Sequence, residues 1–271
     1  MSSMRRVTGR DRRSGAIASA DPVTAAIANN AITVYGRWHF AASNITLTTG
    51  KISQANDVGG NAYHVTQGTA ANRPTPVAAG KNGKDVAQFI NGTSNVSLSK
   101  TTGLALAAGN AFSVAFVWKV DTGPDATRYI SPWLSTNSLG QSGVNVELYD
   151  TTNTRRVRWK NGAGADVGIT TFGTYTLGTW EVWVVRVSAA SNGGAATQAS
   201  YRVNGAAQSP TGTPAVWECQ AGTRNIILGN RTVTAGTYDE TIAEIISADV
   251  YWSDAQVSAL ETALNLKWGV Y

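Results

Sequence analysis

Alternating hydrophobic and polar residues predict β-strands along most of the chain. In residues 111–120 every second side chain is large and hydrophobic: Phe112, Val114, Phe116, Trp118 and Val120. This period of two is typical of a strand with one buried face. Residues 181–188 are hydrophobic on both faces, with one face made by Trp183, Val185 and Val187 and the other by Val182 and Val184. Such a strand is expected between two layers of structure.

Turn residues separate these segments and favour many short strands. Further strands are predicted at residues 144–149, 155–160, 199–203, 225–229 and 243–252. Asn-Gly pairs, which favour tight hairpin turns, recur at Asn82-Gly83, Asn91-Gly92, Asn161-Gly162, Asn192-Gly193-Gly194 and Asn204-Gly205. Because no long helices alternate with the strands, the pattern excludes parallel α/β folds and predicts an all-β sandwich or barrel.

One helix is predicted at the end of the chain, over residues 253–268. Ser253 is followed three residues later by Gln256, the spacing of a capping box. Hydrophobic residues then recur at helical spacing on one face: Val257, Leu260, Leu264 and Trp268. Gly269 supplies the residue type that most often ends a helix. We expect this hydrophobic face to pack on the sandwich.

Residues 1–30 differ from the rest of the chain. Their basic residues are Arg5, Arg6, Arg10, Arg12 and Arg13. Asp11 and Asp21 are the acidic residues of this segment, which carries +3 of the total net charge of +5. Residues 16–30 are small and weakly hydrophobic and are interrupted by Pro22, so they bury too little surface to fold alone. We interpret residues 1–30 as an extended docking arm, with a disordered tail as the alternative, and residues 31–271 as one domain.

Composition narrows the class of protein. Hydrophobic residues make up 42% of the chain and charged residues 14%, against about a quarter charged in typical domains. No hydrophobic run reaches the roughly 20 residues of a membrane helix, and no hydrophobic core of a secretion signal follows the arginines. The single cysteine, Cys219, excludes an internal disulfide framework, and two histidines, His39 and His64, give little material for a metal or triad site. We expect a soluble protein without cofactor, made in a cytoplasm.

Two segments carry a resemblance to a known family. Residues 38–98, which begin "WHFAASNITLTTGKISQANDVGGNAYHV", resemble the opening of the laminin-G-like, concanavalin A-type jelly rolls found in bacteriophage virion proteins. Residues 243–271, "AEIISADVYWSDAQVSALETALNLKWGVY", are similar to the closing strand and helix of that family. The resemblance implies a jelly-roll β-sandwich with one C-terminal helix. A fold alone implies no activity.

The resemblance implies a structural role in a virion. The expected protein is a capsid decoration or head-fibre protein that displays the sandwich on the virion surface. Its arm would contact the major capsid protein or another virion protein, and it would assemble as a homo-oligomer. The alternative is a carbohydrate-binding adhesin of a tail or baseplate that recognises glycans on the host surface.

The spacing of the carboxylates decides whether the sequence fits a glycoside hydrolase of this fold. Retaining glucanases of this fold use an E-x-D-x-x-E strand, because acid and nucleophile must lie close together. Glu147 and Asp150 have the wrong spacing, and Asp239, Glu240 and Glu244 do not form a matching pair. No nucleophile elbow or phosphate-binding loop occurs. We predict a protein that is not an enzyme.

Calcium and sugar are the remaining small ligands. Asp57 with Asn61, and Asp121 with Asp125, could supply oxygen ligands to calcium, but acidic residues are common in turns for backbone reasons, so we predict no metal. Carbohydrate sites combine an aromatic surface with polar groups. Since Trp118, Trp183 and Trp252 are expected in the core, the candidate sugar-binding residues are Trp133, Trp217, Tyr149 and Asp150.

The distribution of charge does not favour nucleic acid as a partner, although the isoelectric point is about 9.4. Most of the excess positive charge lies in residues 1–30, and residues 31–271 carry only +2. A basic stripe with interleaved aromatic residues, which marks many nucleic-acid sites, is absent from the sequence. Arg155, Arg156 and Arg158 cluster, and we interpret the strand face of Arg156, Arg158 and Lys160 as solvated.

Overall fold

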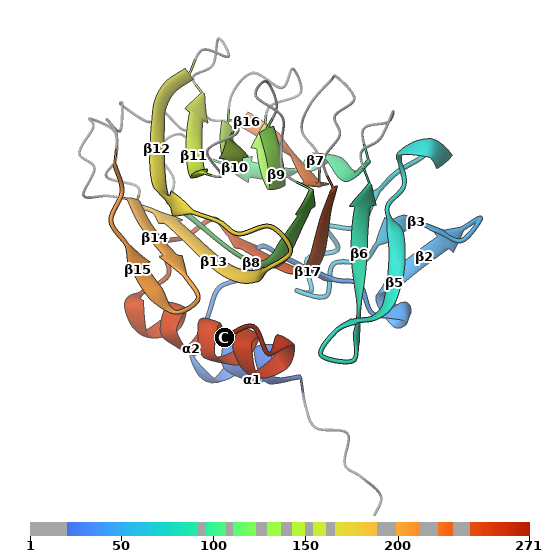
Figure 1. Ribbon diagram of the computed structural model, residues 1–271, viewed down its shortest axis with the longest axis horizontal. Helices are drawn as coiled ribbons and strands as arrows, with labels where there is room; N and C mark the ends of the chain where they lie inside the picture. Colours follow the sequence, from blue (N-terminus) through green and yellow to red (C-terminus); the bar gives the residue numbers. More distant parts are fainter. Residues whose placement is uncertain are drawn as a thin grey trace, which may run out of the picture.

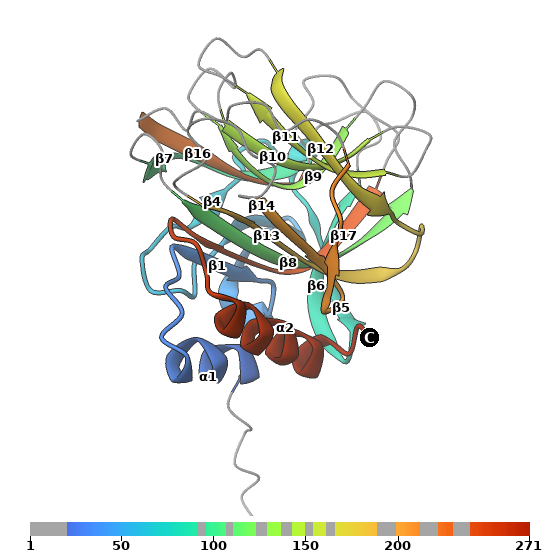
Figure 2. The ribbon, with the colours of Figure 1, turned by 90° about the vertical axis from the view of Figure 1, so that its left-hand side faces the viewer.

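The computed structural model describes residues 21–90, 96–106, 111–122, 129–136, 143–149, 154–160, 166–188, 199–211, 222–229 and 239–271. Two antiparallel sheets face each other, and two helices cover the outer face of one of them (Figure 1). The view at right angles shows the same three layers, with the helices on the side of β8 and β13 (Figure 2). The all-β sandwich with a C-terminal helix is therefore confirmed.

The first sheet has eight strands in the described part of the chain. Its strands are β1 (Gly36–His39), β5 (Thr75–Lys81), β6 (Lys84–Ile90), β8 (Phe112–Thr122), β13 (Trp180–Val187), β14 (Ala199–Val203), β15 (Ala206–Gln208) and β17 (Asp239–Ala248). They are ordered β15-β14-β13-β8-β17-β6-β5. One edge of β17 is shared, since its first half pairs with β6 and its second half pairs with β1.

Within the same described ranges, the second sheet has nine strands, ordered β12-β11-β10-β9-β16-β7-β4-β3-β2. They are β2 (Ile45–Thr48), β3 (Lys51–Ala55), β4 (Val65–Thr66), β7 (Ser97–Leu106), β9 (Tyr129–Thr136), β10 (Gly143–Tyr149), β11 (Thr154–Lys160), β12 (Asp166–Thr174) and β16 (Gly222–Gly229). Short 3₁₀ helices lie at Ala42–Asn44 and Ala70–Asn72. The two strand orders complete a jelly-roll sandwich.

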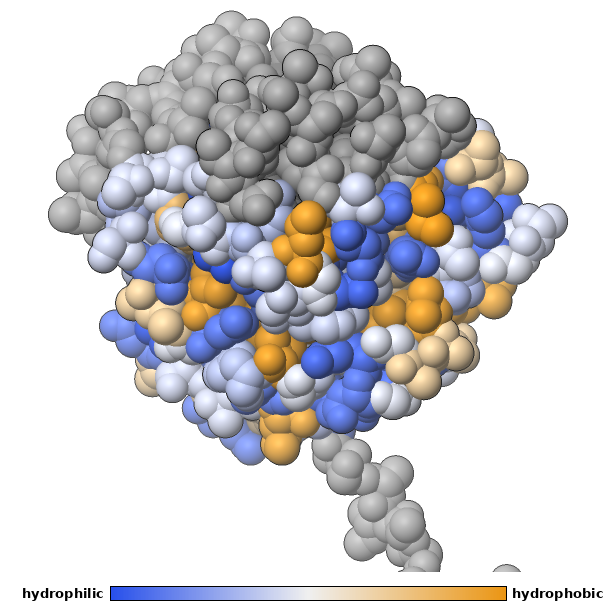
Figure 3. Space-filling view, in the orientation of Figure 1, coloured by the Kyte–Doolittle hydropathy of each residue, from blue (hydrophilic) through white to orange (hydrophobic). Residues whose placement is uncertain are grey.

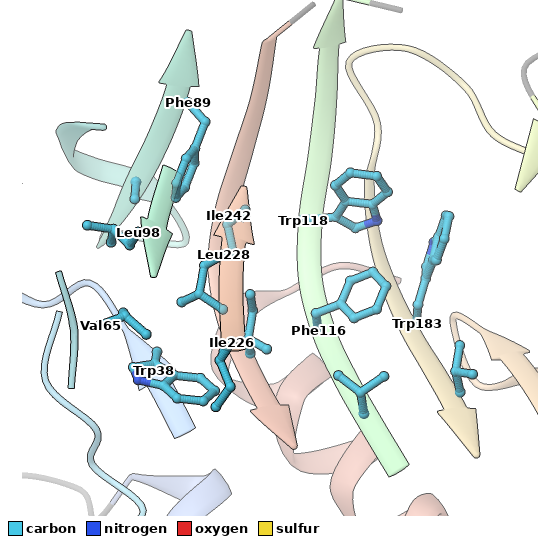
Figure 4. Close-up of a cluster of buried hydrophobic side chains, with 14 of the residues drawn as sticks. Trp38, Val65, Phe89, Leu98, Phe116, Trp118, Trp183, Ile226, Leu228 and Ile242 are labelled. Carbon is cyan, nitrogen blue, oxygen red and sulfur yellow. The ribbon is translucent and has the colours of Figure 1, made fainter. Parts of the chain in front are cut away.

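The main hydrophobic core fills the space between the sheets (Figure 4). Alternate residues of β13 point in opposite directions, because successive side chains of a strand lie on opposite faces. Trp183 belongs to the core between the sheets, whereas Val182 and Val184 belong to the cluster beneath the helices. This confirms the two buried faces predicted for residues 181–188. Trp118 is also buried in the core, and Trp252 is buried in the helix-facing cluster.

Helix α2 (Asp254–Trp268) has the predicted ends. The Ser253 hydroxyl accepts a hydrogen bond from the Gln256 backbone, and the Gln256 side chain accepts one from Ser253 N, which completes the capping box. Gly269 ends the helix in the left-handed conformation, with φ of 58°. The predicted face, Val257, Leu260, Leu264 and Trp268, is buried on the outer surface of the first sheet.

A second helix, α1 (Pro22–Asn29), moves the boundary of the folded domain. The prediction placed residues 1–30 in an extended arm, but residues 21–30 belong to the folded body. Pro22 starts the helix, because its fixed φ and missing N–H suit the first turn, and the Asp21 carboxylate accepts from Val23 N at 2.9 Å. Val23 is fully buried in the cluster that includes α2 residues. Contact with α2 thus supplies the burial that the segment lacks alone. Residues 1–20 lie outside the described residues.

The predicted Asn-Gly turns that lie in the described residues are confirmed. Asn82-Gly83 joins β5 to β6, and Asn204-Gly205 joins β14 to β15; all four residues have positive φ, as a type I′ turn requires. The other three Asn-Gly sites lie outside the described residues. No helix in the described ranges is long and hydrophobic enough to cross a membrane.

Two predictions about individual segments need correction. The last strand spans Asp239–Ala248 rather than residues 243–252. The face containing Arg156 is not solvated at that residue, whose exposure is 3%. Its neighbour Arg155 is also buried and pairs with Glu181. This ion pair compensates the buried charge of Arg155.

Candidate functional site

Two of the four predicted sugar-binding residues, Trp133 and Tyr149, lie in the described part of the chain. Trp133 lies in β9 and Tyr149 in the neighbouring strand β10, and Trp133 pairs with Val146. The described structure places the backbone of these two residues but not their side chains. Asp150 and Trp217 lie outside the described residues, as do Arg5, Arg6, Arg10, Arg12 and Arg13. These assignments stay predictions.

The calcium candidate Asp57 has a structural role instead. Its carboxylate accepts hydrogen bonds from four backbone N–H groups, those of Arg37, Gly59, Asn61 and Tyr63, at 2.7–3.2 Å. A carboxylate has about four lone-pair directions, so this set occupies them. Asp57 therefore organises its loop. Within the described ranges no group of three metal-ligating side chains occurs.

The buried glutamates of β17 do not form a catalytic pair. Glu244 points toward the helices, where it contacts Arg37, Lys267 and Trp268. Glu240 shares its strand face with Ile242, which belongs to the core between the sheets. A register shift in β17 between Ile242 and Glu244 turns Glu244 to the other face. The two carboxylates therefore lie on opposite sides of one strand. This arrangement does not provide the close acid and nucleophile of a retaining glycosidase.

A cavity of about 350 Å³ combines concave shape with polar groups. It lies where the start of α1, the end of α2, the end of β1 and the β5–β6 turn meet. Its lining residues are Asp21, Pro22, His39, Ala41, Gly83, Lys84, Asp85, Lys267 and Trp268. The turn is fixed to α2 because Asn82 Nδ2 donates to the carbonyl of Lys267 at 2.9 Å. The volume is at the low end of the range for small-molecule sites, about 300–1,000 Å³.

Four charged side chains form a closed ring beneath this cavity. Arg37 pairs with Glu244 at 2.6 Å and with Asp21 at 2.7 Å. Lys267 pairs with the same two carboxylates, at 2.8 Å to Glu244 and 3.0 Å to Asp21. Each cation therefore contacts both anions. The ring joins the cap of α1, strands β1 and β17, and the last turn of α2.

The ring holds both carboxylates in their ionised form. Burial alone would raise the pKa of Glu244, but the charges of Arg37 and Lys267 outweigh it and hold the pKa below its ordinary value. The same balance of burial against these two cations lowers the pKa of Asp21. The indole N–H of Trp268 donates to Glu244 Oε2 at 2.7 Å. The ring is thus satisfied without a ligand.

His39 faces the cavity as a neutral imidazole. Burial and the nearby charge of Lys267 lower the pKa of His39 to about 4. Its ring nitrogens lie 3.1–3.2 Å from Asn44 Nδ2, and one of them can accept a hydrogen bond from this amide. A neutral imidazole has one donor and one acceptor nitrogen. His39 can therefore exchange a hydrogen bond with a ligand hydroxyl.

The β5–β6 turn contributes the polar groups most open to a ligand. Lys84 is exposed, and within the described part of the chain its ammonium has no hydrogen-bond partner. Asp85 accepts from Ala79 N through one oxygen, at 3.2 Å, which leaves its other oxygen for a ligand. Donors and acceptors thus converge on a small cavity with Trp268 and Pro22 in its wall. This is the arrangement expected for a small polar ligand.

A larger hollow between α1 and α2 presents fewer charged groups to a ligand. Its volume is about 670 Å³, and its lining is mostly small residues, with Leu266 at 72% exposure on its edge. None of its described lining residues is charged. On the face seen in Figure 3, hydrophilic and hydrophobic residues are interspersed over the coloured part. The polar cavity is therefore the better candidate site.

Sequence reasoning missed this cavity. The sequence patterns indicate no role for His39 and place Asp21 in the arm. The contributing residues come from positions 21, 37–41, 83–85, 244 and 267–268, which no local motif connects. A signal was available in part, because the end of the predicted C-terminal helix contains Lys267 next to Trp268. Their partners emerge only from the fold.

Comparison with solved structures identifies the architecture. The binding domain of Paraclostridial Mosquitocidal Protein 1 matches with a TM-score of 0.59 and 12% identity, over 84% of this chain and 51% of that chain. The binding domain of botulinum neurotoxin serotype G matches with a TM-score of 0.60 and 12% identity, over 85% and 51%. This chain therefore shares the β-sandwich fold of these two binding domains.

A sialidase shares the same fold. The Trypanosoma rangeli sialidase solved with sialic acid matches with a TM-score of 0.56 and 12% identity, over 86% of this chain and 33% of that chain. This chain thus spans about half the length of the two binding domains and about a third of the sialidase. The sequence matches no protein-family model and no curated protein. At 12% identity, these likenesses concern the fold alone.

Proposed function

We propose that this chain is a glycan-binding module and that the cavity lined by Lys84, Asp85 and His39 is its ligand site. The alternative drawn from the sequence, an adhesin, is thereby preferred. The cavity carries this proposal, because sugar hydroxyls both donate and accept hydrogen bonds, and ammonium, carboxylate and imidazole groups converge there. The binding-domain neighbours are consistent with this role.

A non-catalytic role is part of the proposal. In the described site, Asp21 and Glu244 are both engaged by Arg37 and Lys267. Neither is positioned as a proton donor with a raised pKa, because the cations lower the pKa of both. General acid catalysis instead needs a pKa near the working pH. The state of these two carboxylates therefore supports the proposal of binding without turnover.

The test is glycan binding by the full chain and by variants of the rim. A neutral and acidic glycan array identifies the ligand, and calorimetry with the best glycan gives the affinity. We expect Lys84→Ala to weaken binding about tenfold or more, since a hydrogen bond from a charged group contributes roughly 1.5–3 kcal/mol. The matched control is Lys51→Ala, at the β2–β3 turn outside the cavity. Equal affinity of the two variants would remove the cavity as the site.

We also propose that the module is carried on a virion. The observation that favours this placement is the basic segment 1–20, with five arginines and one acidic residue, joined directly to Asp21. The segment would contact the major capsid protein or another virion protein, and the chain would assemble as a homo-oligomer on the virion surface. The test is co-sedimentation with purified particles of the full chain and of a chain lacking residues 1–20. Failure of the full chain to join particles would refute this placement.

A further inference from the structure

We propose that the ligand of this cavity is an uncharged sugar, and that sialylated, sulfated and uronic-acid glycans are disfavoured. This inference rests on the glycan-binding function proposed above and specifies its substrate class. It is drawn from the balance of charges at the site. The sialidase that matches over a third of its length was solved with sialic acid, but a shared fold at 12% identity carries no ligand preference.

The two buried cations at the cavity, Arg37 and Lys267, are already paired with carboxylates. Arg37 is 3% exposed, and its guanidinium is held by Glu244, Asp21 and the hydroxyl of Thr24. Lys267 is 6% exposed and contacts both carboxylates of the ring. Lys267 lines the cavity, but an anionic ligand beside it would also lie close to the carboxylates of Asp21 and Glu244. The negative charges of these two carboxylates oppose the attraction of the cation for the ligand.

The positive and negative charges around the cavity balance as well. Lys84 and Asp85 are adjacent in the sequence and both line the cavity. The cations that line or underlie the cavity are Lys84, Lys267 and Arg37, and the anions are Asp21, Asp85 and Glu244. The attraction of Lys84 for an anion is opposed by Asp85 beside it. The cavity therefore has no excess positive charge for a carboxylate or sulfate.

The protonation of His39 also affects the charge of the cavity. A protonated imidazole would add a positive charge to the cavity and favour acidic ligands. Burial and the charge of Lys267 lower the pKa of His39 to about 4, so the ring is neutral at physiological pH. Lys267, Arg37, Asp21 and Glu244 are the charged groups that act on this ring. His39 thus contributes hydrogen bonding without net charge.

The experiment compares neutral glycans with their acidic counterparts on the full chain. An array carries each neutral glycan beside its sialylated and sulfated forms, such as lactose beside 3′-sialyllactose. The affinity of the best neutral glycan is then measured by calorimetry at 0.05 and 0.5 M sodium chloride. We expect preference for the neutral member of each pair and less than a twofold change with salt, because screening acts on charge–charge attraction.

A variant that removes one negative charge tests the effect of charge on ligand choice directly. Asp85→Asn keeps an oxygen that accepts from Ala79 N but gives the cavity an excess positive charge. We expect this variant to gain on the order of fivefold or more in affinity for the acidic member of a pair, since nearby unit charges interact by about 1 kcal/mol even in water. Lys51→Ala again serves as the control, and cooperative unfolding of each variant confirms that it is folded.

The outcomes separate the two proposals. Tighter binding of sialylated than of neutral glycans by the native chain would overturn the uncharged-ligand inference while leaving glycan binding intact. An Asp85→Asn variant with unchanged affinity for acidic glycans would likewise refute the charge argument. A folded chain that binds no glycan of either kind would overturn the proposed function, and the inference with it.

Discussion

Two glutamates four residues apart on β17 should respond to the same substitution in opposite ways. Glu240 and Glu244 are both fully buried. Within the described residues, neither oxygen of Glu240 has a hydrogen-bond partner, whereas Glu244 is held by Arg37, Lys267 and Trp268. Replacing each glutamate with glutamine keeps the shape and removes the charge. The comparison therefore isolates what each environment does to a carboxylate.

Glu240 should make the protein less stable as the pH rises. Burial, with a smaller contribution from the charge of Asp121, raises the pKa of Glu240 to about 8, against 4.5 in an unfolded chain. Between these values the folded protein keeps a proton that the unfolded chain has lost. Stability then falls with increasing pH, by about 1.4 kcal/mol per pH unit in the middle of this window.

Glu240→Gln removes this dependence because glutamine does not ionise. We expect the stability of the variant, relative to the native protein, to increase by about 3 kcal/mol between pH 5 and pH 8. The assay is urea unfolding followed by tryptophan fluorescence at pH 5, 6, 7 and 8. All other titrating groups are shared, so they cancel in the difference between the two proteins. A difference that stays constant over this range would refute the assignment of a protonated, buried carboxyl group.

Glu244→Gln should instead destabilise the protein at neutral pH. It leaves Arg37 and Lys267 buried with one carboxylate fewer, and breaking a buried ion pair in this way costs about 3–5 kcal/mol. Because the cations lower the pKa of Glu244, its contribution is present above about pH 4.5 and is lost as the pH falls below that value. The penalty of the variant should shrink correspondingly in acid. A penalty no larger than that of Glu240→Gln at pH 7 would contradict a stabilising ion ring.

Two further variants test the ends of the chain. Deleting residues 1–20 should leave the melting temperature unchanged, whereas deleting residues 1–30 removes Asp21 and α1 and should lower it clearly; calorimetry distinguishes them, and equal melting temperatures would show that α1 contributes nothing. Ser253→Ala should cost about 1 kcal/mol in urea unfolding through loss of the helix cap. Ser258→Ala, on the exposed surface of the same helix, is its control and should be nearly neutral.

The elements predicted correctly are those that local residues specify. The capping box at Ser253 and the glycine at position 269 mark both ends of α2, and the period of two marks β8 and the two buried faces of β13. Strands such as β2 and β5 escaped prediction because most of their residues are partly or fully exposed. Without a buried face, the alternation of hydrophobic and polar residues disappears. Their pairing is decided by neighbouring strands instead.

Helix α1 shows how tertiary contact overrides a weak local signal. Its eight residues are mostly small, it has no acidic residue in its first turn, and a helix of this length is unstable alone. Val23 nevertheless becomes fully buried in the cluster that includes residues of α2. Residues 21–30 and the predicted C-terminal helix are therefore parts of one structure. The composition of residues 1–30 gives no sign of this contact.

The ion ring explains why the site could not be predicted from the sequence and why it depends on the whole fold. Asp21 and Lys267 are separated by 246 positions and yet lie 3.0 Å apart. Arg37, Glu244 and Lys267 are buried, and each of their charges is tolerable because it pairs with two charges of opposite sign. The wall of the cavity thus exists only when α1, β1, β17 and α2 have all assembled. Stability of the domain and integrity of the proposed binding site should consequently be lost together when any member of the ring is removed.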